Sequence, residues 1–183
     1  MISGFGAATA GSRLSRCRHA AKAGLTILAL VLTCAPARTA ERQTPSGLPV
    51  PRYVTLKFGE VNARAGPGDD YAARWAYRVR GLPVQVVAET AEWRKVCDPE
   101  GGSAWVHRRT TDGHRSVIRM SAGPLALKAK PTHNSATVAI LPVRAMAPLD
   151  RCKGGWCRIK GDGPPGWAPQ SAVWGATDSP QCR

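Results

Sequence analysis

The sequence has no apolar run long enough to cross a bilayer. Its longest, residues 23–32, has ten residues, whereas a membrane-spanning helix needs about 20. A positive region precedes this run: Arg13, Arg16, Arg18 and Lys22. Because Ala35-Pro36-Ala37 follows as a small-x-small cleavage site, residues 1–37 are predicted to be a cleaved signal peptide, and the protein periplasmic or secreted. An uncleaved anchor is the alternative, and lipid attachment at Cys34 is disfavoured because Thr33 stands where Gly, Ala or Ser is usual.

Patterns that support catalysis are also missing. The four histidines are scattered, and no serine, histidine and aspartate combine with a nucleophile elbow. After residue 37, Cys97 and His107 are the one close thiol and imidazole pair, and a thiol in an exported chain is usually oxidised or buried. Asp69 and Asp70 are turn residues and not a glycosidase pair, and no glycine-rich loop is suited to holding a phosphate. We therefore predict that the protein is not an enzyme and uses no cofactor.

Acidic residues are few. Twelve stand against 26 lysines and arginines, and the formal net charge is +14. The four basic residues before residue 38 leave with the signal peptide and no acidic residue does, so the mature chain carries +10. This charge predicts attraction to an anionic polymer, a lipid surface or acidic peptides, with a merely solvated basic surface as the alternative. The charges stand singly along the chain and form no run that could follow a phosphate backbone, so nucleic acid is not an expected partner.

The chain lacks the sustained 3.6-residue periodicity of amphipathic helices. Its 19 glycines and 15 prolines divide it into short apolar or alternating segments, which indicates strands and turns. Clear strand candidates are residues 53–57, 82–88, 93–97, 104–108 and 115–119. Residues 71–77 fit one helical turn as well as a strand. We predict an all-β chain whose strands close into small barrels, since closure removes exposed sheet edges.

A weak internal repeat divides the chain into two modules. Residues 61–67 (Val-Asn-Ala-Arg-Ala-Gly-Pro) are echoed 64 residues later by residues 125–131 (Leu-Ala-Leu-Lys-Ala-Lys-Pro). An apolar stretch with prolines follows in both copies, at 81–87 and 141–146. Two tryptophans then stand at matching positions in each copy: Trp93 and Trp105, then Trp156 and Trp167. One module has therefore been used twice.

Four cysteines remain after residue 37, and an even number in an exported protein indicates disulfides. Cys152 and Cys157 flank a glycine-containing turn, so we expect them to face each other across a hairpin. Cys97 and Cys182 would then tie the tail back onto the first module. Zinc is the competing interpretation, but Cys-x4-Cys with scattered histidines lacks a tight ligand spacing, and no metal site is predicted.

The first module carries the signature Asn62-x-Arg64-x-Gly66-Pro67, then Gly81 before an apolar strand, then Trp93 and Trp105. This pattern resembles the bacterial SH3-like domain. With the lead-in from Ser46 and the close of the second module at Gly175, the chain is similar to exported tandem SH3-like proteins of Gram-negative bacteria. The second module departs from the signature, because Lys128 and Lys130 replace the arginine and the glycine.

The resemblance implies two SH3-like β-barrels of five to six strands in tandem after the signal peptide. The expected divisions are a signal peptide at 1–37, a lead-in at 38–51, barrels at 52–114 and 115–176, and a tail at 177–183. Members of this family are commonly non-catalytic modules that recognise cell-wall peptides or envelope proteins. The resemblance therefore implies a peptidoglycan peptide or an envelope protein as partner, bound mainly by the first module. A polyanion-binding protein and a structural spacer are the alternatives.

The signature residues have structural roles in our interpretation. Gly66 and Pro67 predict a turn, in which proline presets φ and glycine takes a positive φ. Asn62 and Arg64 alternate along a strand and share one face, with Asn62 bonded to local backbone and Arg64 packed across an aromatic ring. The tryptophans of the signature, Trp93 and Trp105, are expected to be buried.

Ligand binding is assigned to an aromatic cluster that follows the signature. Tyr71, Trp75 and Tyr77 are the candidates for an exposed groove, which would suit an extended peptide. Arg74 and Arg78 stand among them and would favour an acidic ligand.

Overall fold

The computed structural model describes residues 44–161, 163–177 and 181–182. The expected signal peptide, including Cys34, and the start of the lead-in lie outside these residues. Within the described part of the chain, no helix has the length and apolar character that crossing a bilayer requires. Both barrels described below belong to one compact unit of the chain.

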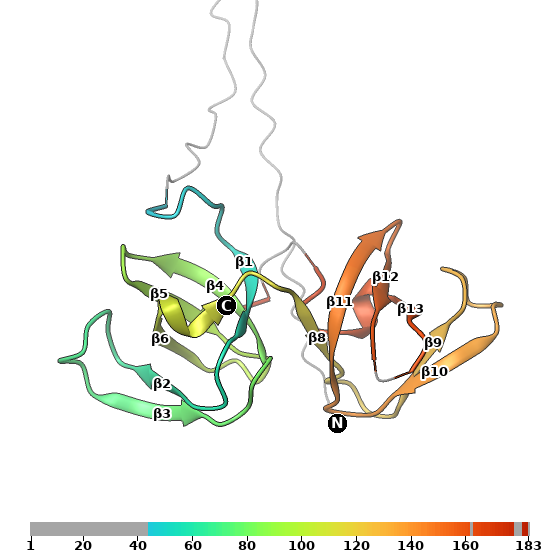
Figure 1. The fold of residues 1–183 in the computed structure, drawn as a ribbon, viewed down its shortest axis with the longest axis horizontal. Coiled ribbons are helices and arrows are strands. Elements are labelled where there is room, and N and C mark those ends of the chain that lie inside the picture. Colours follow the sequence, from blue (N-terminus) through green and yellow to red (C-terminus); the bar gives the residue numbers. More distant parts are fainter. Residues whose placement is uncertain (1–43, 162, 178–180, 183) are drawn as a thin grey trace, which may run out of the picture. The chain divides into compact units, whose positions relative to one another are not determined.

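The described residues form thirteen strands in two antiparallel sheets, one after the other along the chain (Figure 1). Helical structure among them is limited to two single 3₁₀ turns, η1 (Arg108–Thr110) and η2 (Gln170–Ala172). The predicted all-β class with two tandem barrels is confirmed. The undecided segment 71–77 becomes a turn followed by strand β3.

The first barrel is a seven-stranded sheet in the order β3-β2-β6-β5-β4-β1-β7. Its strands are β1 (Arg52–Leu56), β2 (Val61–Arg64), β3 (Ala73–Tyr77), β4 (Pro83–Glu89), β5 (Trp93–Cys97), β6 (Ser103–His107) and β7 (Thr111–Asp112). The two-residue β7 pairs with β1, which takes the sheet beyond the expected five to six strands.

The second barrel is a six-stranded sheet in the order β10-β9-β13-β12-β11-β8. Its strands are β8 (Ser116–Ile118), β9 (Leu125–Lys128), β10 (Thr137–Leu141), β11 (Met146–Lys153), β12 (Trp156–Ile159) and β13 (Gly166–Pro169). As predicted from the repeat, Trp93 and Trp156 begin equivalent strands, β5 and β12.

Each sheet encloses its own apolar core. In the first barrel the core is built from valine, alanine and leucine side chains of β1, β2, β4, β5 and β6, with the aromatic ring of Tyr77 from β3. In the second barrel Leu127, Leu141 and Ile159 occupy the centre with the Cys157 sulfur. Two separate cores mean that the barrels are independent packing units joined at their junction.

The junction between the two barrels is stabilised by a hydrogen bond, an aromatic contact and the C-terminal tail. The Ser116 hydroxyl donates to the Gly81 carbonyl oxygen at 2.6 Å, and the Tyr53 ring meets the Trp174 ring edge to face with centroids 4.9 Å apart. Beyond the second barrel, the Gln181 backbone N–H donates to the side-chain oxygen of Gln85 at 2.9 Å. The C-terminal segment therefore returns to the first barrel.

Both cysteine pairs expected from the sequence form disulfides in the structure. Cys152 and Cys157 are directly opposite each other on β11 and β12, with Cα atoms 4.0 Å apart. Cys97, at the end of β5, is bonded to Cys182 of the tail, with Cα atoms 6.1 Å apart. The first bond closes a hairpin, and the second links the first barrel to the C-terminal tail across 85 residues.

Candidate ligand-binding site

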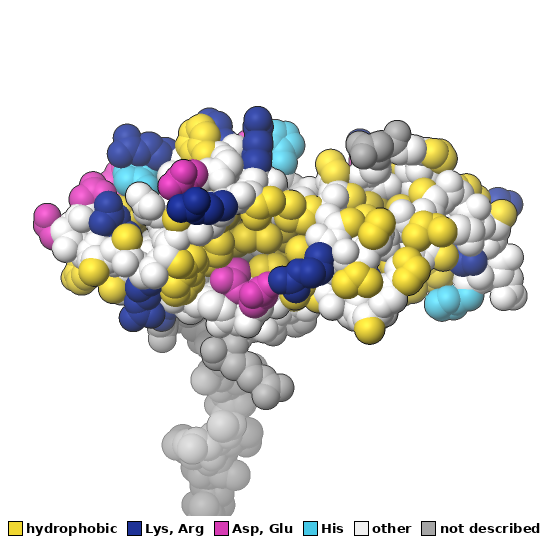
Figure 2. Space-filling model, turned by 90° about the horizontal axis from the view of Figure 1, so that it is seen from below, with side chains coloured by type: hydrophobic (Ala, Val, Ile, Leu, Met, Phe, Trp, Pro, Cys, Tyr) yellow, Lys and Arg dark blue, Asp and Glu magenta, His cyan; other side chains and the backbone are white. Residues whose placement is uncertain are grey.

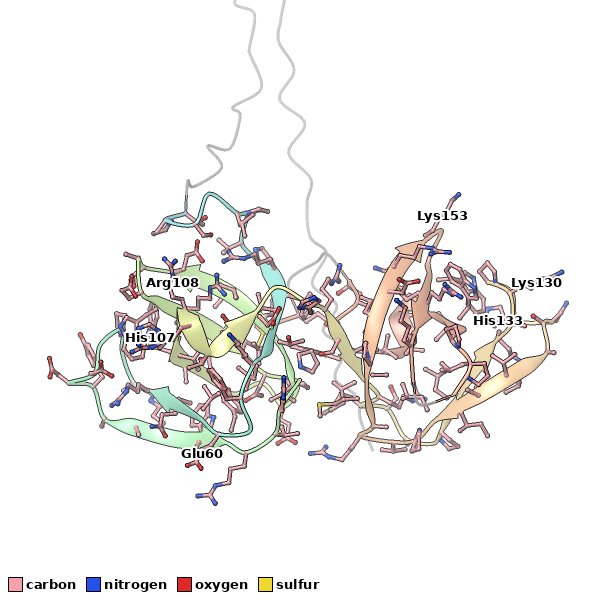
Figure 3. All side chains as sticks on the ribbon, in the orientation of Figure 1. Glu60, His107, Arg108, Lys130, His133 and Lys153 are labelled. Atoms are coloured by element: carbon pink, nitrogen blue, oxygen red, sulfur yellow. A yellow bond between two sulfur atoms is a disulfide. The ribbon has the colours of Figure 1, made fainter. Side chains whose placement is uncertain are left out.

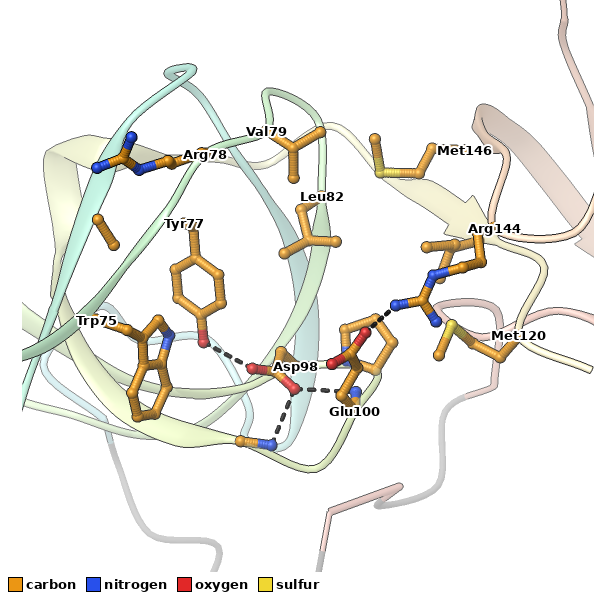
Figure 4. A pocket seen from close by; sticks show the side chains of 14 residues that line it. Trp75, Tyr77, Arg78, Val79, Leu82, Asp98, Glu100, Met120, Arg144 and Met146 are labelled. Carbon is orange, nitrogen blue, oxygen red and sulfur yellow. Dashed lines mark hydrogen bonds and ion pairs between the residues drawn. The ribbon is translucent and has the colours of Figure 1, made fainter.

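A cleft of about 670 Å³ lies between the two barrels (Figures 2 and 4). From the first barrel it is lined by the end of β3, the loop that follows and the turn between β5 and β6; from the second, by β8 and the start of β11. Figure 2 shows hydrophobic side chains gathered over this middle region, with acidic and basic side chains beside them. The apolar walls are Leu82, Ile118, Met120 and Met146.

Tyr77 and Asp98 form the polar floor of the cleft. The Tyr77 hydroxyl donates to Asp98 Oδ2 at 3.0 Å. The other carboxylate oxygen accepts the backbone N–H groups of Glu100 and Gly102, both at 2.9 Å, and so shapes the β5–β6 turn. Burial, together with the Asp98 carboxylate, raises the pKa of Tyr77 above its usual range. The phenol therefore stays neutral and serves as a fixed donor.

Arg144 carries the charge on the second barrel's side. Its guanidinium donates to Glu100 of the first barrel across the cleft, and both side chains are more than half exposed (Figure 4). Its backbone has φ of +63°, the one non-glycine residue in the described chain with a positive value. An arginine there is unusual, because a side chain strains the left-handed conformation that glycine adopts freely.

The repeat shows which residue the fold itself would prefer at this position. In the first barrel Gly81 N–H donates to Leu56 O, and Leu56 N–H donates to Leu82 O. In the second barrel the same two bonds run from Arg144 to Arg119 and from Arg119 to Ala145, 63 residues later. Arg144 therefore stands where the first barrel has Gly81, whose φ is +81°.

The ion pair with Glu100 does not explain this choice. A left-handed conformation costs a non-glycine residue about 1 kcal/mol or more. An exposed ion pair returns about 0.2–1 kcal/mol, so the strain and the ion pair roughly cancel. Strained residues of this kind gather at functional sites, and Arg144 stands at the edge of the cleft.

The structure brings together three of the five predicted ligand-binding residues. Trp75, Tyr77 and Arg78 line the cleft. Tyr71 and Arg74 are exposed and do not line it. The expectation that Tyr77 would be an exposed loop residue is wrong: it is the last residue of β3, its side chain is 8% exposed, and its ring belongs to the core.

Tyr71 instead packs on the signature turn. Its ring lies so close to Gly66 that a Cβ atom there would be 2.3 Å from the ring carbons. Gly66 has no positive φ, so the predicted reason for this glycine is wrong, and close approach of the ring replaces it. Arg64 holds the same loop, because its Nη1 donates to the carbonyl oxygens of Asp69 and Tyr71 at 2.9 and 2.8 Å.

Arg64 also lies over an aromatic ring, as expected, with its guanidinium carbon 6.0 Å from the centre of the Trp93 ring. Asn62 shares its face on β2 and is exposed, opposite Ala76 of β3. The signature thus orders a loop outside the cleft, and Pro67 continues that loop.

The structure of the second barrel shows why its sequence can depart from the signature. Turn bonds of the same kind align Gly66 with Lys130 and Tyr71 with Ser135. Ser135 has no ring to cover the turn, so a side chain at position 130 meets no obstacle there. Its hydroxyl accepts the Lys130 backbone N–H at 3.0 Å.

The four repeat tryptophans are not equally buried. Trp93 is 8% exposed and packs against His107, with ring centres 5.2 Å apart. Trp105, Trp156 and Trp167 are only partly buried. Trp105 was expected to be buried, but on β6 it points to the face opposite its neighbours Ala104 and Val106, which are the core residues.

Several cleft residues were not among the sequence candidates: Asp98, Glu100, Ile118, Met120, Arg144 and Met146. Sequence reasoning misses most of them because they come from a turn and from the second module, whereas binding is expected mainly from the first module. The signal for Arg144 was obscured because the repeat was aligned in the wrong register, with 141–146 opposite 81–87. The hydrogen bonds place Arg144 opposite Gly81.

No group of three or more histidine, cysteine or carboxylate side chains that could hold a metal ion occurs among the described residues. The cleft has the geometry of a binding groove, with apolar walls, the neutral phenol of Tyr77 hydrogen-bonded to the Asp98 carboxylate, the Arg144–Glu100 ion pair and the exposed Arg78.

The bacterial SH3 domain model matches this chain twice, over residues 57–113 and 122–175. The two matches cover more than half of the sequence, and the chain belongs to the bacterial SH3 domain family. The family predicted from the signature is confirmed.

Among solved structures, the chain is similar to NlpC2 from Trichomonas vaginalis, at 13% identity, with 67% of this chain and 47% of that one covered and a TM-score of 0.33. It is similar to NlpC1 from the same organism at 14% identity, with 82% and 51% covered and a TM-score of 0.31. The chain spans about half the length of each. Comparison with curated proteins gives no match.

Proposed function

We propose that this chain is an exported binding protein without catalytic activity. Its ligand is an extended peptide of the cell wall or of an envelope protein, held in the cleft between the two barrels. Membership of the bacterial SH3 domain family supports a cell-wall-related binding role. The observation that carries the site is Arg144, a strained arginine at the edge of the cleft where the repeat otherwise uses Gly81.

The cleft suits a peptide that bears a free carboxylate. Arg144 would pair with that carboxylate in place of Glu100, and Arg78 adds a second positive charge from the first barrel's wall. Met120 and Met146 offer flexible apolar surface to side chains of the ligand. The neutral phenol of Tyr77 is bonded to Asp98 and keeps the floor rigid.

The test is retention of the mature protein on purified peptidoglycan sacculi, at low salt and at about 0.15 M salt, where exposed charges are screened beyond about 8 Å. The wild type is expected to be retained at both concentrations, because contacts inside the cleft are short. Arg144→Gly is expected to be retained at least about 10-fold less, which corresponds to the loss of one charge-assisted contact of about 1.5 kcal/mol. Arg109→Gln, on the exposed η1 turn, is the control with the same loss of charge.

The outcomes separate the alternatives. Retention at low salt alone would favour the polyanion interpretation. Absence of retention at both concentrations would exclude a wall peptide and turn the search to protein partners by crosslinking in the periplasm. If Trp75→Ala leaves every binding partner unaffected while the protein remains folded, the cleft is not the site and the spacer interpretation gains support.

A further inference from the structure

The positive charge of the mature chain is concentrated in the second module. Residues 115–176 contain nine lysines and arginines and two aspartates, a formal charge of +7. Residues 52–114 contain ten basic and eight acidic residues, a charge of +2. The two modules contain similar numbers of basic residues, so the asymmetry arises from the acidic ones, of which the second module has far fewer.

A cross-strand row collects much of this charge on one face. In the register of the sheet, Arg151 is opposite Arg158, Arg158 is opposite Trp167, and Trp167 is opposite Lys128. Directly opposed residues on antiparallel strands point to the same face. The residues between them, Cys157 on β12 and Ala168 on β13, are fully buried in the core, so the row faces outward.

A second row extends the same face along the strands. Lys153 is opposite Trp156, and Lys160 follows Arg158 by two residues. Figure 3 shows Lys153 at the free end of the β11–β12 hairpin. The basic face therefore comprises Lys128, Arg151, Lys153, Trp156, Arg158, Lys160 and Trp167. It is spread across four strands and along them.

One carboxylate is shared by three of these cations. Asp150 Oδ2 lies 3.3 Å from Arg151 Nη1 and 3.2 Å from Arg158 Nη1, and Asp150 Oδ1 lies 3.2 Å from Lys160 Nζ. These contacts lower the pKa of Asp150, chiefly through the Lys160 hydrogen bond, so it remains ionised. Even so, the face keeps a large positive excess.

The surroundings of the two tryptophans of the basic face favour a lipid surface as the ligand over a polymer whose bases or sugars would stack on the rings. The Arg151 guanidinium carbon lies 5.5 Å from the centre of the Trp167 ring, and the His133 ring lies 4.8 Å from the Trp156 ring. One side of each ring is thus already covered, which leaves less room for a base or a sugar to stack. Tryptophan is enriched at the membrane–water interface of membrane proteins, and lysine and arginine near an anionic leaflet are attracted to it.

We propose that the basic face docks the protein on an anionic phospholipid bilayer. The cations of the basic face are arranged in two dimensions, as the headgroups of a bilayer are. A linear polymer would instead be matched by a single row of cations. The proposal is independent of the cleft, because the two sites use different side chains. Strand β11 contributes to both, with Met146 at its start lining the cleft and Arg151 and Lys153 at its far end on the basic face. The second barrel then holds the protein at a membrane surface while the cleft remains accessible to its own ligand.

The experiment measures co-sedimentation of the mature chain with vesicles of phosphatidylcholine alone, or with about 30% phosphatidylglycerol, a composition that gives a negative surface potential. Binding is expected only to the anionic vesicles and is expected to fall steeply as salt is raised to about 0.5 M. The test variant combines Lys128→Gln, Arg151→Gln and Lys153→Gln, and keeps Arg158 to balance Asp150. The control combines Lys57→Gln, Arg80→Gln and Arg109→Gln on the first barrel, with the same change in net charge.

The basic-face variant is expected to bind anionic vesicles roughly 100-fold more weakly than the wild type, because each basic residue at such a surface contributes about a factor of five. The control is expected to lose less than about 5-fold. Equal losses in the two variants would overturn the proposal and assign binding to net charge. Absence of wild-type binding to anionic vesicles, or binding to soluble polyphosphate alone, would overturn it as well. If the triple variant does not fold, single substitutions at Lys128 and at Lys57 are compared in the same assay.

Discussion

Arg144 occupies in the second barrel the backbone position that Gly81 occupies in the first, and both residues have a positive φ. The equivalence rests on two matching hydrogen bonds and not on sequence identity. Glycine at this position is therefore compatible with the fold, and the second barrel has an arginine there instead.

Replacing Arg144 by glycine should therefore weaken binding without lowering the stability of the protein. The strain at φ +63° disappears and the ion pair to Glu100 is lost, so we expect the free energy of unfolding to stay the same or to rise by up to about 1 kcal/mol. Urea denaturation measures this change. Glu100→Gln frees Arg144 without removing it, and should preserve or strengthen peptide binding. A loss of stability with both variants would mean that the ion pair holds the barrels together.

The contact between Tyr71 and Gly66 makes a second prediction. Gly66→Ala places a methyl group against the Tyr71 ring and should cost about 1–3 kcal/mol, because the ring must leave its site on the turn. The second barrel has Lys130 and Ser135 at these positions, so Gly66→Ala combined with Tyr71→Ser should be less destabilised than the sum of the single variants. A double-mutant cycle by thermal unfolding measures the coupling. Additive losses would show that the ring does not set the requirement for glycine.

The fold could be predicted from the sequence because its signals are local. Short strands, glycine turns and matched tryptophans recur at a nearly constant offset, and Trp93 and Trp156 begin strands as the repeat predicts. The hairpin around Cys152 and Cys157 could also be predicted, since Gly154 and Gly155 both adopt the positive φ that a tight turn requires.

The cleft could not be predicted in the same way, because its two walls come from different modules. Tyr77 was expected in a loop since the strand β3 contains an exposed arginine and a half-buried tryptophan, which resembles a surface segment. Its burial depends on pairing with Val61 of β2 and on the distant Asp98. The basic face could not be predicted for a similar reason. Single charges two residues apart can be assigned to one face of the sheet only once the strands and their register are known.

A buried ion pair near the lead-in should make the free energy of unfolding depend on pH. The Glu89 side chain is 2% exposed, and although burial alone would raise its pKa, hydrogen bonds from Ser46 and Arg52 lower the pKa to about 2. A carboxyl group with a depressed pKa contributes stability above its ordinary pKa of about 4.5, and this stability is lost as the pH falls toward 2.

Glu89→Gln should therefore lower stability at pH 7 by about 3 kcal/mol, because it leaves Arg52 and Arg94 without their carboxylate. It should also flatten the decline in stability between pH 5 and 2. Urea denaturation at several pH values measures both effects, with the exposed Glu60→Gln as control. An acid decline that persists in Glu89→Gln would assign the pH dependence to other carboxylates.

Replacing Trp93 by alanine and replacing Trp105 by alanine should lower the stability of the protein by different amounts. Trp93 is buried against His107 and beneath Arg64, so Trp93→Ala should cost about 3–5 kcal/mol. Trp105 is partly exposed on the outer face, so Trp105→Ala should cost about 1–2 kcal/mol, in proportion to the area it buries. Thermal unfolding of the two variants measures the difference. Equal losses would place Trp105 in the core despite the outward direction of its side chain.

The last prediction concerns the two disulfides, which close chain segments of very different length. Cys97–Cys182 spans 85 residues and Cys152–Cys157 spans five. In the chain-entropy model, the long loop stabilises the fold by about 4.5 kcal/mol and the short one by about 2 kcal/mol. Replacing Cys97 and Cys182 by serine should thus be the more destabilising change, and should release the tail, whose Gln181 donates to Gln85. Urea denaturation compares the two double variants, and limited proteolysis reports cleavage near the tail. A larger loss on removal of the hairpin bond would mean that local geometry at β11 and β12 matters more than closure of the 85-residue loop.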